Sequence, residues 1–387
     1  MPHPLKTLNL GRGLETALKS SHPWIYRNHL PNHTLEDGDW VRLEAGQTSA
    51  IGLYDADSPI AVRLFSREGV PDRDWIHTRI KRALELRNLI SEDTDAYRLL
   101  YGEGDGLPGI VADKYGRYVV IKTYSKSVEV ILDDVVRALS KELNIKGIVR
   151  RDPEGLEALW GELPPPEVTV KENGLNFIAN LYEGQKTGLF LDQRENRQTL
   201  RYFASGKCVL NLFSYNGGFS VYALAGGASF VRSVDIAEAA NQDAKRNVTA
   251  NKLEPSQHET VTADVFKLLE TYVADKEMFD IVVLDPPSLA KDKKSRFAAI
   301  RAYQKLNRQA LKCVVPGGLL VSSSCTSQVG PEDFKKMLAD AAQSAGVSAQ
   351  LIHEAGHALD HPVPIQFPEG RYLKFAVMRV FRSKTLG

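Results

Sequence analysis

The second half of the chain alternates between short apolar runs and stretches with helical spacing. The most pronounced run, Ile281-Val282-Val283-Leu284, ends abruptly in Asp285-Pro286-Pro287. A continuous run of Ile, Val and Leu is typical of a strand buried on both faces of a parallel sheet. Alternating strands and helices indicate βαβ units, so we predict a Rossmann-like α/β domain over residues 191–387. Asp285 then lies at the ligand-facing end of a strand, although an Asp-Pro turn that merely ends the strand is an alternative.

The first 190 residues show different patterns. Three short β-prone runs predict a small β-barrel in residues 1–70, with a small β-sandwich as the alternative. Apolar residues at helical spacing between 74 and 90 predict a connector helix, and two runs that flank Tyr115-Gly116-Arg117 predict a hairpin. Residues 71–190 therefore form this helix and a central α+β domain. The glycine-, lysine- and arginine-rich stretch 180–197 is interpreted as a lid over the site, with a solvated loop as the alternative.

Small or acidic residues follow the predicted strands of the last domain in order. Gly217-Gly218 lie between a strand and a helix, where the main chain approaches a ligand closely. Asp235 ends the next strand at the distance typical of a ribose-binding carboxylate, and Asp264 follows the third strand, placed to meet an adenine edge. Each acid alone is equally typical of a solvated loop. Together with Asp285 they predict a site for a nucleoside cofactor.

The net charge and the cysteine content limit the partners and the cellular compartment that we expect. The net charge is +1, so a nucleic-acid partner must be bound by local patches. The cysteines at 208, 313 and 325 have neither metal-ligand spacing nor even pairing, which favours a reducing cytoplasm and no metal site. No stretch is long enough to span a bilayer, so we expect no membrane partner. Trp24 and Arg27 lie in a segment of interleaved aromatic and cationic residues, a candidate RNA clamp or a cover for the end of the barrel.

The sequence resembles the class I S-adenosylmethionine-dependent methyltransferases and, among them, the bacterial RlmI-type family of 23S rRNA 5-methylcytosine methyltransferases. The resemblance covers nearly the whole chain and implies an N-terminal PUA domain, S-adenosyl-L-methionine as cofactor, RNA as partner and an antiparallel seventh strand near 372–380. Whether the chain forms a homodimer stays open. The matching segments are 21–26, 102–109, 190–194, 211–218, 285–287, 324–325 and 360–362.

The resemblance also assigns roles to residues. Asp285 should lie beside the sulfonium of the cofactor. The other cofactor-binding residues that it implies are Asn211, Phe213, Ser214, Tyr215, Asn216, Gly217, Gly218, Asp235 and Asp264.

Cys325 is the predicted catalytic nucleophile. A strand over residues 319–326, preceded by a helix-ending Pro316-Gly317-Gly318, places it near Asp285. Carbon 5 of cytosine becomes nucleophilic when a thiolate adds to carbon 6, and thiolate is also a good leaving group. A core role is the alternative, because free cysteine is often buried.

One position departs from many RNA 5-methylcytosine enzymes, which carry a second cysteine after the Asp-Pro motif. Here Ser288 follows Pro287, so the base that removes the C5 proton is not identified, and Asp285 is instead a candidate to hold the flipped cytosine. Lys291, Lys293 and Lys294 follow as candidate phosphate ligands or as a solvated helix start.

Two other classes remain. The first is an exocyclic-amine methyltransferase, because the Asp-Pro-Pro motif also suits amine targets. Such sites usually have an aromatic residue at the position that Ser288 occupies here. The second alternative is a non-catalytic RNA-binding or assembly protein, which would not bind adenosylmethionine. A nicotinamide oxidoreductase fits less well, because the G-x-G-x-x-G fingerprint is missing.

Overall fold

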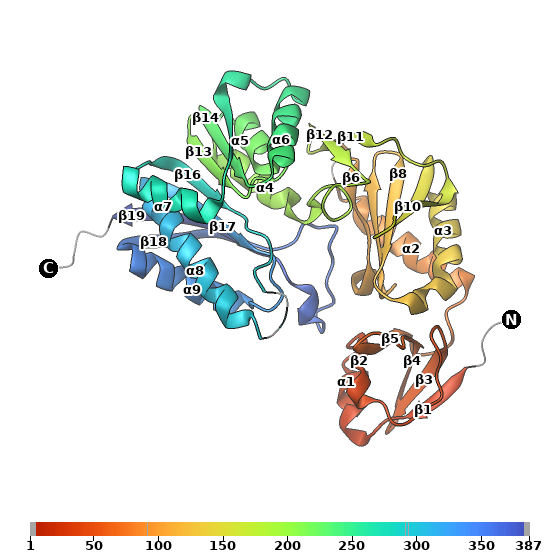
Figure 1. Ribbon diagram of the computed structural model, residues 1–387. Helices are drawn as coiled ribbons and strands as arrows, with labels where there is room; N and C mark the ends of the chain where they lie inside the picture. Colours follow the sequence, from red (N-terminus) through yellow and green to blue (C-terminus); the bar gives the residue numbers. More distant parts are fainter. Residues whose placement is uncertain (1–4, 91, 291, 293, 383–387) are drawn as a thin grey trace. The chain divides into compact units, whose positions relative to one another are not determined.

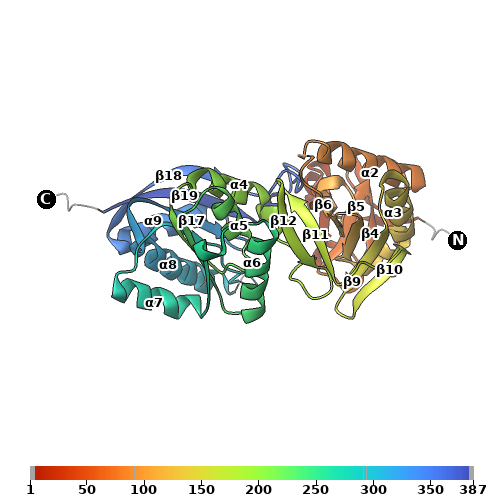
Figure 2. The same ribbon diagram turned by 90° about the horizontal axis from the view of Figure 1, so that it is seen from above.

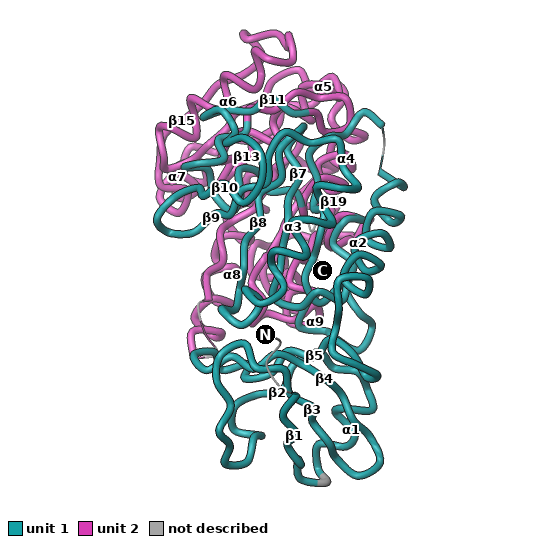
Figure 3. The backbone as a smooth tube through the Cα atoms, turned by 90° about the vertical axis from the view of Figure 1, so that its right-hand side faces the viewer, with its two compact units in different colours: residues 1–170, 179–191, 359–370 teal, residues 171–178, 192–358, 371–387 magenta. Residues whose placement is uncertain are grey.

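A computed structural model gives the fold and describes residues 5–90, 92–290, 292 and 294–382. The chain forms two compact units (Figures 1 and 3). Unit 1 contains residues 1–170, 179–191 and 359–370, and unit 2 contains 171–178, 192–358 and 371–387. A two-stranded hairpin of β11 (Glu167–Glu172) and β12 (Leu175–Asn180) lies where the chain passes between the units.

The first sheet of unit 1 confirms the predicted all-β N-terminal region. Its strand order is β1-β3-β4-β5-β2, and apolar residues such as Ile25, Leu43 and Val62 form a core of its own. The short helix α1 (Glu15–Lys19) contributes Leu18 to this core. The strands are β1 (Lys6–Asn9), β2 (Trp24–Tyr26), β3 (Trp40–Ala45), β4 (Thr48–Tyr54) and β5 (Ile60–Ser66).

The second sheet of unit 1 has the order β10-β9-β8-β7-β6 and packs against two helices. The predicted connector helix is α2 (Arg73–Arg87), which the side chain of Asp72 caps by accepting from the Trp75 N–H. The predicted hairpin is the antiparallel pair β7 and β8, which α3 (Glu129–Glu142) follows. The strands are β6 (Ala96–Tyr101), β7 (Ile110–Tyr115), β8 (Tyr118–Thr123), β9 (Gly147–Asp152) and β10 (Gly155–Gly161).

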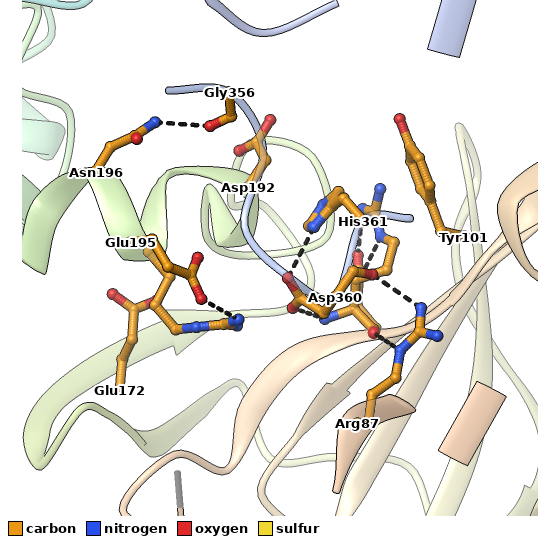
Figure 4. A network of polar contacts seen from close by, with 12 residues as sticks. Arg87, Tyr101, Glu172, Asp192, Glu195, Asn196, Gly356, Asp360 and His361 are labelled. Atoms are coloured by element: carbon orange, nitrogen blue, oxygen red, sulfur yellow. Dashed lines mark hydrogen bonds and ion pairs between the residues drawn. The ribbon is translucent and has the colours of Figure 1, made fainter. Parts of the chain in front are cut away.

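A buried polar network joins the 359–370 segment to the rest of unit 1 (Figure 4). Arg87 donates to both carboxylate oxygens of Asp105, at 2.7 and 2.8 Å, and to the main-chain oxygen of Asp360 at 2.8 Å. The Asp360 carboxylate accepts from the Arg98 N–H and contacts Nδ1 of His361. Asp360 is fully buried. The Asp-His-Pro segment that the resemblance includes therefore anchors the chain within this unit.

Replacing Arg87 by alanine should destabilise unit 1 by about 3–5 kcal/mol, because Asp105 would stay buried without its cation. The matched control is Arg73→Ala on the same helix, whose ion pair with Asp134 is 69% exposed on the arginine side and should cost less than about 1 kcal/mol. Urea unfolding followed by the fluorescence of the tryptophans measures both. Equal effects of the two substitutions would contradict the anchoring role of Arg87.

Unit 2 is built on a seven-stranded sheet with the order β15-β14-β13-β16-β17-β19-β18. The first five strands are parallel, and β19 is antiparallel to both of its neighbours. This confirms the Rossmann-like fold and the antiparallel seventh strand predicted near 372–380. The strands are β13 (Cys208–Leu212), β14 (Phe230–Asp235), β15 (His258–Thr262), β16 (Phe279–Leu284), β17 (Val314–Ser324), β18 (Val347–Ala355) and β19 (Lys374–Arg382).

Helices cover both faces of this sheet (Figures 1 and 2). Three helices pack on one face through a cluster that includes Leu210, Leu284 and Leu320, and they are α7 (Val265–Asp275), α8 (Arg296–Lys312) and α9 (Pro331–Ala345). The other three contact one another in sequence, and they are α4 (Arg194–Phe203), α5 (Gly218–Ala225) and α6 (Glu238–Ala250).

Two local predictions were wrong. Pro316-Gly317-Gly318 does not end a helix: α8 ends at Lys312, and the three residues lie within β17, where the pairing with β16 is irregular between Phe279 and Ile281. The alternative of a solvated loop for the stretch 180–197 is wrong over residues 191–197, which form the 3-10 helix Leu191–Gln193 and the start of α4. Their charged groups are paired in the interior, since buried Arg197 donates to both carboxylate oxygens of Glu172. A lid over the site stays a prediction.

Candidate active site

The carboxyl edge of the parallel strands collects the predicted site positions. The order of the strands reverses between β13 and β16, where Leu212 is opposite Leu284, and ligands of open α/β sheets bind at such a switch point. β14 and β15 lie on one side of this point, and β17 lies on the other. Five predicted positions therefore end or follow neighbouring strands at one edge of the sheet: Gly217, Asp235, Asp264, Asp285 and Cys325.

The turn after β13 has an unusual backbone. Phe213 and Tyr215 have φ of 58° and 47°, a left-handed conformation that costs a non-glycine residue about 1–2 kcal/mol. Gly217 has φ of 77°, and a Cβ there would lie 2.8 Å from Cβ of Ala244 on α6. Glycine at 217 is therefore required by the turn and by the packing of α6. Strain of this kind is typical of segments that hold a ligand.

Main-chain donors fix two of the three acids. The Asp235 carboxylate accepts from the N–H of Tyr215 at 2.9 Å and from that of Ala237 at 3.0 Å, which ties the strained turn to β14. Asp264 caps α7, where its Oδ1 accepts from the N–H of Phe266 and of Lys267. Both side chains are half-buried. Their orientation is therefore set before any ligand binds.

Two buried polar atoms, one near the end of β13 and one in the turn after it, fit the cofactor that the resemblance implies. Oδ1 of Asn211 and Oγ of Ser214 have no hydrogen-bond partner within the described part of the chain, although Nδ2 of Asn211 donates to Ser220. A buried polar atom without a partner costs about 1–3 kcal/mol, which a complementary ligand group would recover. S-adenosylmethionine carries amino, carboxylate, hydroxyl and adenine groups that match these atoms and the two acids.

An amide chain holds Asp285. Nε2 of Gln193 donates to Oδ1 of Asp285 at 3.0 Å, and Nδ2 of Asn196 donates to Oε1 of Gln193 at 2.6 Å. The same Nδ2 donates to the main-chain oxygen of Gly356, a contact that Figure 4 shows. Gln193 and Asn196 are buried, whereas Asp285 is half-buried. Pro286 and Pro287 restrict the main chain after it. The carboxylate is therefore held rigidly at the edge of the sheet.

Cys325 directly follows β17 and is half-buried. The next residue, Thr326, is fully buried, and its Oγ1 is hydrogen-bonded to the Tyr303 hydroxyl at 2.5 Å and to Oγ of Ser288 at 3.2 Å. Ser288 thus joins the loop after Asp285 to the loop that carries Cys325.

The other two cysteines are poor nucleophiles. Burial, reinforced by Asp280, raises the pKa of the Cys208 thiol. Burial raises the pKa of the Cys313 thiol to about 11. Since the thiolate is the reactive form, these two groups stay largely protonated near neutral pH.

The predicted RNA-binding residues of the first sheet have partners within unit 1. Nε1 of Trp24 donates to Glu103 at 2.7 Å, and its ring contacts Phe367 edge-on at 4.5 Å between ring centroids. The Arg27 guanidinium donates to the hydroxyl of Tyr54 and to two main-chain oxygens. These contacts favour structural roles for both side chains, and RNA binding by them stays a prediction. Of the predicted lysines, Lys294 is exposed, whereas Lys291 and Lys293 lie outside the described residues.

Four residues were not identified from the sequence. Gln193 and Asn196 lie in the stretch predicted as a lid, and Tyr303 and Lys374 lie on α8 and β19. The segment Asp192-Gln193-Arg194 belongs to the resemblance, which is a signal for Gln193. Nothing local to Tyr303 or Lys374 points to Cys325, because they lie 22 and 49 residues from it and only the tertiary structure brings their contacts together.

Two family models match the chain, one in its N-terminal region and one over more than half of its length. The model described as S-adenosylmethionine-dependent methyltransferase matches residues 137–358, and that of a PUA-like domain matches residues 8–67. No helix within the described ranges is long and apolar enough to cross a membrane.

Curated relatives match over almost the full length. Ribosomal RNA large subunit methyltransferase I of Aeromonas salmonicida is 37% identical over 388 residues, covering 96% of this chain and 98% of the relative. That of Photobacterium profundum is also 37% identical, covering 95% and 98%. Among solved structures, a candidate S-adenosylmethionine-dependent methyltransferase from Streptococcus mutans has a TM-score of 0.86 at 28% identity, covering 97% of this chain and 100% of that chain. A candidate methyltransferase complexed with SAH has a TM-score of 0.87 at the same identity and coverage.

Proposed function

The chain belongs to the S-adenosylmethionine-dependent methyltransferases, in the family of ribosomal RNA large subunit methyltransferase I, and on this premise we propose that it forms 5-methylcytosine in 23S rRNA. The choice of cytosine carbon 5 rests on the half-buried Cys325, which directly follows β17 and so lies beside β16, the strand that Asp285 follows. An amine target needs no thiol nucleophile, whereas carbon 5 of cytosine does.

In the proposed mechanism Cys325 is the nucleophile. Its thiolate adds to carbon 6 of the cytosine, and the electron pair of the C5–C6 double bond makes carbon 5 nucleophilic. S-adenosylmethionine, when bound, supplies the electrophilic methyl group. After methylation, loss of the C5 proton and cleavage of the bond between sulfur and carbon 6 restore the double bond and the thiolate.

Asp285 orients the base. Its fixed carboxylate accepts from the exocyclic amine of the flipped cytosine, which holds carbon 6 in reach of the thiolate. The amide chain through Gln193 keeps this carboxylate in place while the base enters.

Asp235, Asp264 and the turn from Asn211 to Gly218 hold the cofactor in this proposal. Asp235 binds the ribose hydroxyls, Asp264 faces the adenine, and the turn passes beneath the methionine part. Residues 1–70 act as the PUA-like RNA-binding domain, 71–190 as the connector helix and central domain, and 191–387 as the catalytic domain. A cytoplasmic location is consistent with three cysteines that form no disulfide.

Replacing Asp235 by alanine should weaken the binding of S-adenosylmethionine by roughly 10- to 100-fold, because the ribose loses a charged acceptor and the turn loses the hydrogen bond from the Tyr215 N–H. Isothermal titration calorimetry measures this. The matched control is Asp243→Ala on α6, whose 41% exposed carboxylate pairs with Arg246 and which should leave the affinity unchanged. Unchanged affinity in the Asp235 variant would exclude the ribose role.

The modified nucleoside tests the function itself. The protein is incubated with methyl-labelled S-adenosylmethionine and rRNA that lacks the modification, either free or in ribosomal particles, and the RNA is digested to nucleosides. We expect label in 5-methylcytidine. Label in an N-methylated nucleoside would instead support an exocyclic-amine methyltransferase, and comparison of the two RNA forms identifies the substrate.

A further inference from the structure

Lys374 is an almost fully buried lysine at the start of β19. It is 5% exposed, and its strand partner is Ser324, the residue before Cys325. Its Nζ donates to the main-chain oxygen of Thr326 at 2.6 Å and to that of Tyr372 at 2.7 Å. The ammonium group is therefore fixed to the main chain directly after the proposed nucleophile.

This buried cation has no carboxylate partner among the described residues. Both of its acceptors are neutral carbonyl oxygens. A buried charge is costly unless an opposite charge or several dipoles compensate it. The group beside it that can take a negative charge is the Cys325 thiol, so a thiolate would complete the pair.

The electrostatics of the pair agree with this geometry. Burial lowers the pKa of Lys374 to about 8, and the interaction with Cys325 acts in the opposite direction by raising it. The interaction between two charges is reciprocal, so a group that is stabilised as an ammonium by a thiolate also lowers the pKa of that thiol. At pH 7 a group with this pKa is about 90% protonated.

The titratable groups that the described residues place around Lys374 are phenols, a carboxylate and an imidazole, each with a partner of its own. Tyr303, from α8, contacts Thr326, and burial raises the pKa of its phenol, which keeps it neutral. The Tyr372 hydroxyl donates to Asp192, and His357 accepts from the N–H of Leu373 through Nε2. These contacts leave Lys374 as the cation that the described residues place against the Cys325 loop.

We propose that Lys374 is a positioning residue that keeps Cys325 in its thiolate form and holds the loop that carries it. The thiol proton leaves to solvent, and the thiolate remains beside the ammonium group until it attacks the base. This inference rests on the proposed Cys325 chemistry, but it concerns the ionisation of the thiol and can be measured without RNA.

The test is the pH dependence of alkylation of Cys325 by iodoacetamide, read by peptide mass spectrometry in the full-length protein. In the wild type, Cys325 should react before Cys208 and Cys313. Lys374→Met should raise the thiol pKa by about one unit or more, so that Cys325 reacts about tenfold more slowly at pH 7. Lys374→Arg keeps the charge and should preserve most of the reactivity. Lys305→Met, at an exposed ion pair on α8, is the matched control and should match the wild type.

An unchanged pH profile in the Lys374→Met protein would overturn the proposal. Cys313 is fully buried, so its alkylation reports loss of the native fold. If Cys313 becomes reactive in the Lys374→Met protein, the Lys374→Arg protein is used for the test instead. A Cys325 pKa near the ordinary value of about 8.5 in the Lys374→Arg protein would also overturn the proposal. Methyl transfer by a Cys325→Ala protein would refute the proposed function while the alkylation profiles still stood, so the two failures are distinguishable.

Discussion

Replacing Cys325 by alanine should lower the rate of methyl transfer by more than about 1,000-fold, because without the thiolate carbon 5 of cytosine is not nucleophilic. Binding of S-adenosylmethionine should stay within about twofold, since the residues proposed to hold it follow other strands. Single-turnover methylation of rRNA and calorimetry measure the two quantities.

Cys208→Ala is the matched control for this substitution. Cys208 begins β13, at the opposite end of the sheet from the site, and its thiol pKa is raised. Its loss should leave the rate unchanged. A Cys325→Ala protein that retained turnover would exclude the adduct mechanism and would instead support the exocyclic-amine methyltransferase.

Replacing Asp285 by asparagine should lower the rate by about 100- to 1,000-fold with a small effect on folding. The asparagine keeps the shape and an acceptor for Gln193, but it removes the charge that orients the target base. Gln193→Ala should have a smaller effect, about tenfold, because it frees the carboxylate without removing it. Single-turnover rates with saturating RNA measure both.

Asp280 provides the control, because it lies on the same strand near its amino end, where its carboxylate accepts from the N–H of Cys208. Asp280→Asn should methylate at the wild-type rate. If Asp285→Asn were as active as Asp280→Asn, the role of Asp285 at the target base would be refuted.

The strand at 279–284 shows why much of the fold was predictable. Its residues 281–284 are apolar because this part of the strand is buried on both faces, so the sequence alone indicates a parallel sheet and places Asp285 at the sheet edge. The glycines and acids that follow the other strands could be assigned to the same edge of the sheet by the same argument. The antiparallel β19 was less evident from its residues and came from the resemblance.

The details of the site depended on tertiary contacts. The left-handed conformations of Phe213 and Tyr215 have no signal in residue types that normally avoid them. The partners of Asp285 and of the Cys325 loop, Gln193 and Lys374, come from distant segments. A lysine at the start of a strand usually indicates solvent exposure, and only the position of β19 beside β17 buries Lys374.

A covalent trap tests the central claim most directly. In RNA that carries 5-fluorocytosine, the C5 proton that must leave is replaced by fluorine, so elimination is blocked and the adduct between the thiol and carbon 6 persists. The account predicts a stable protein–RNA complex that requires S-adenosylmethionine and whose modified peptide contains Cys325. Absence of the complex, or its formation by the Cys325→Ala protein, would contradict the account.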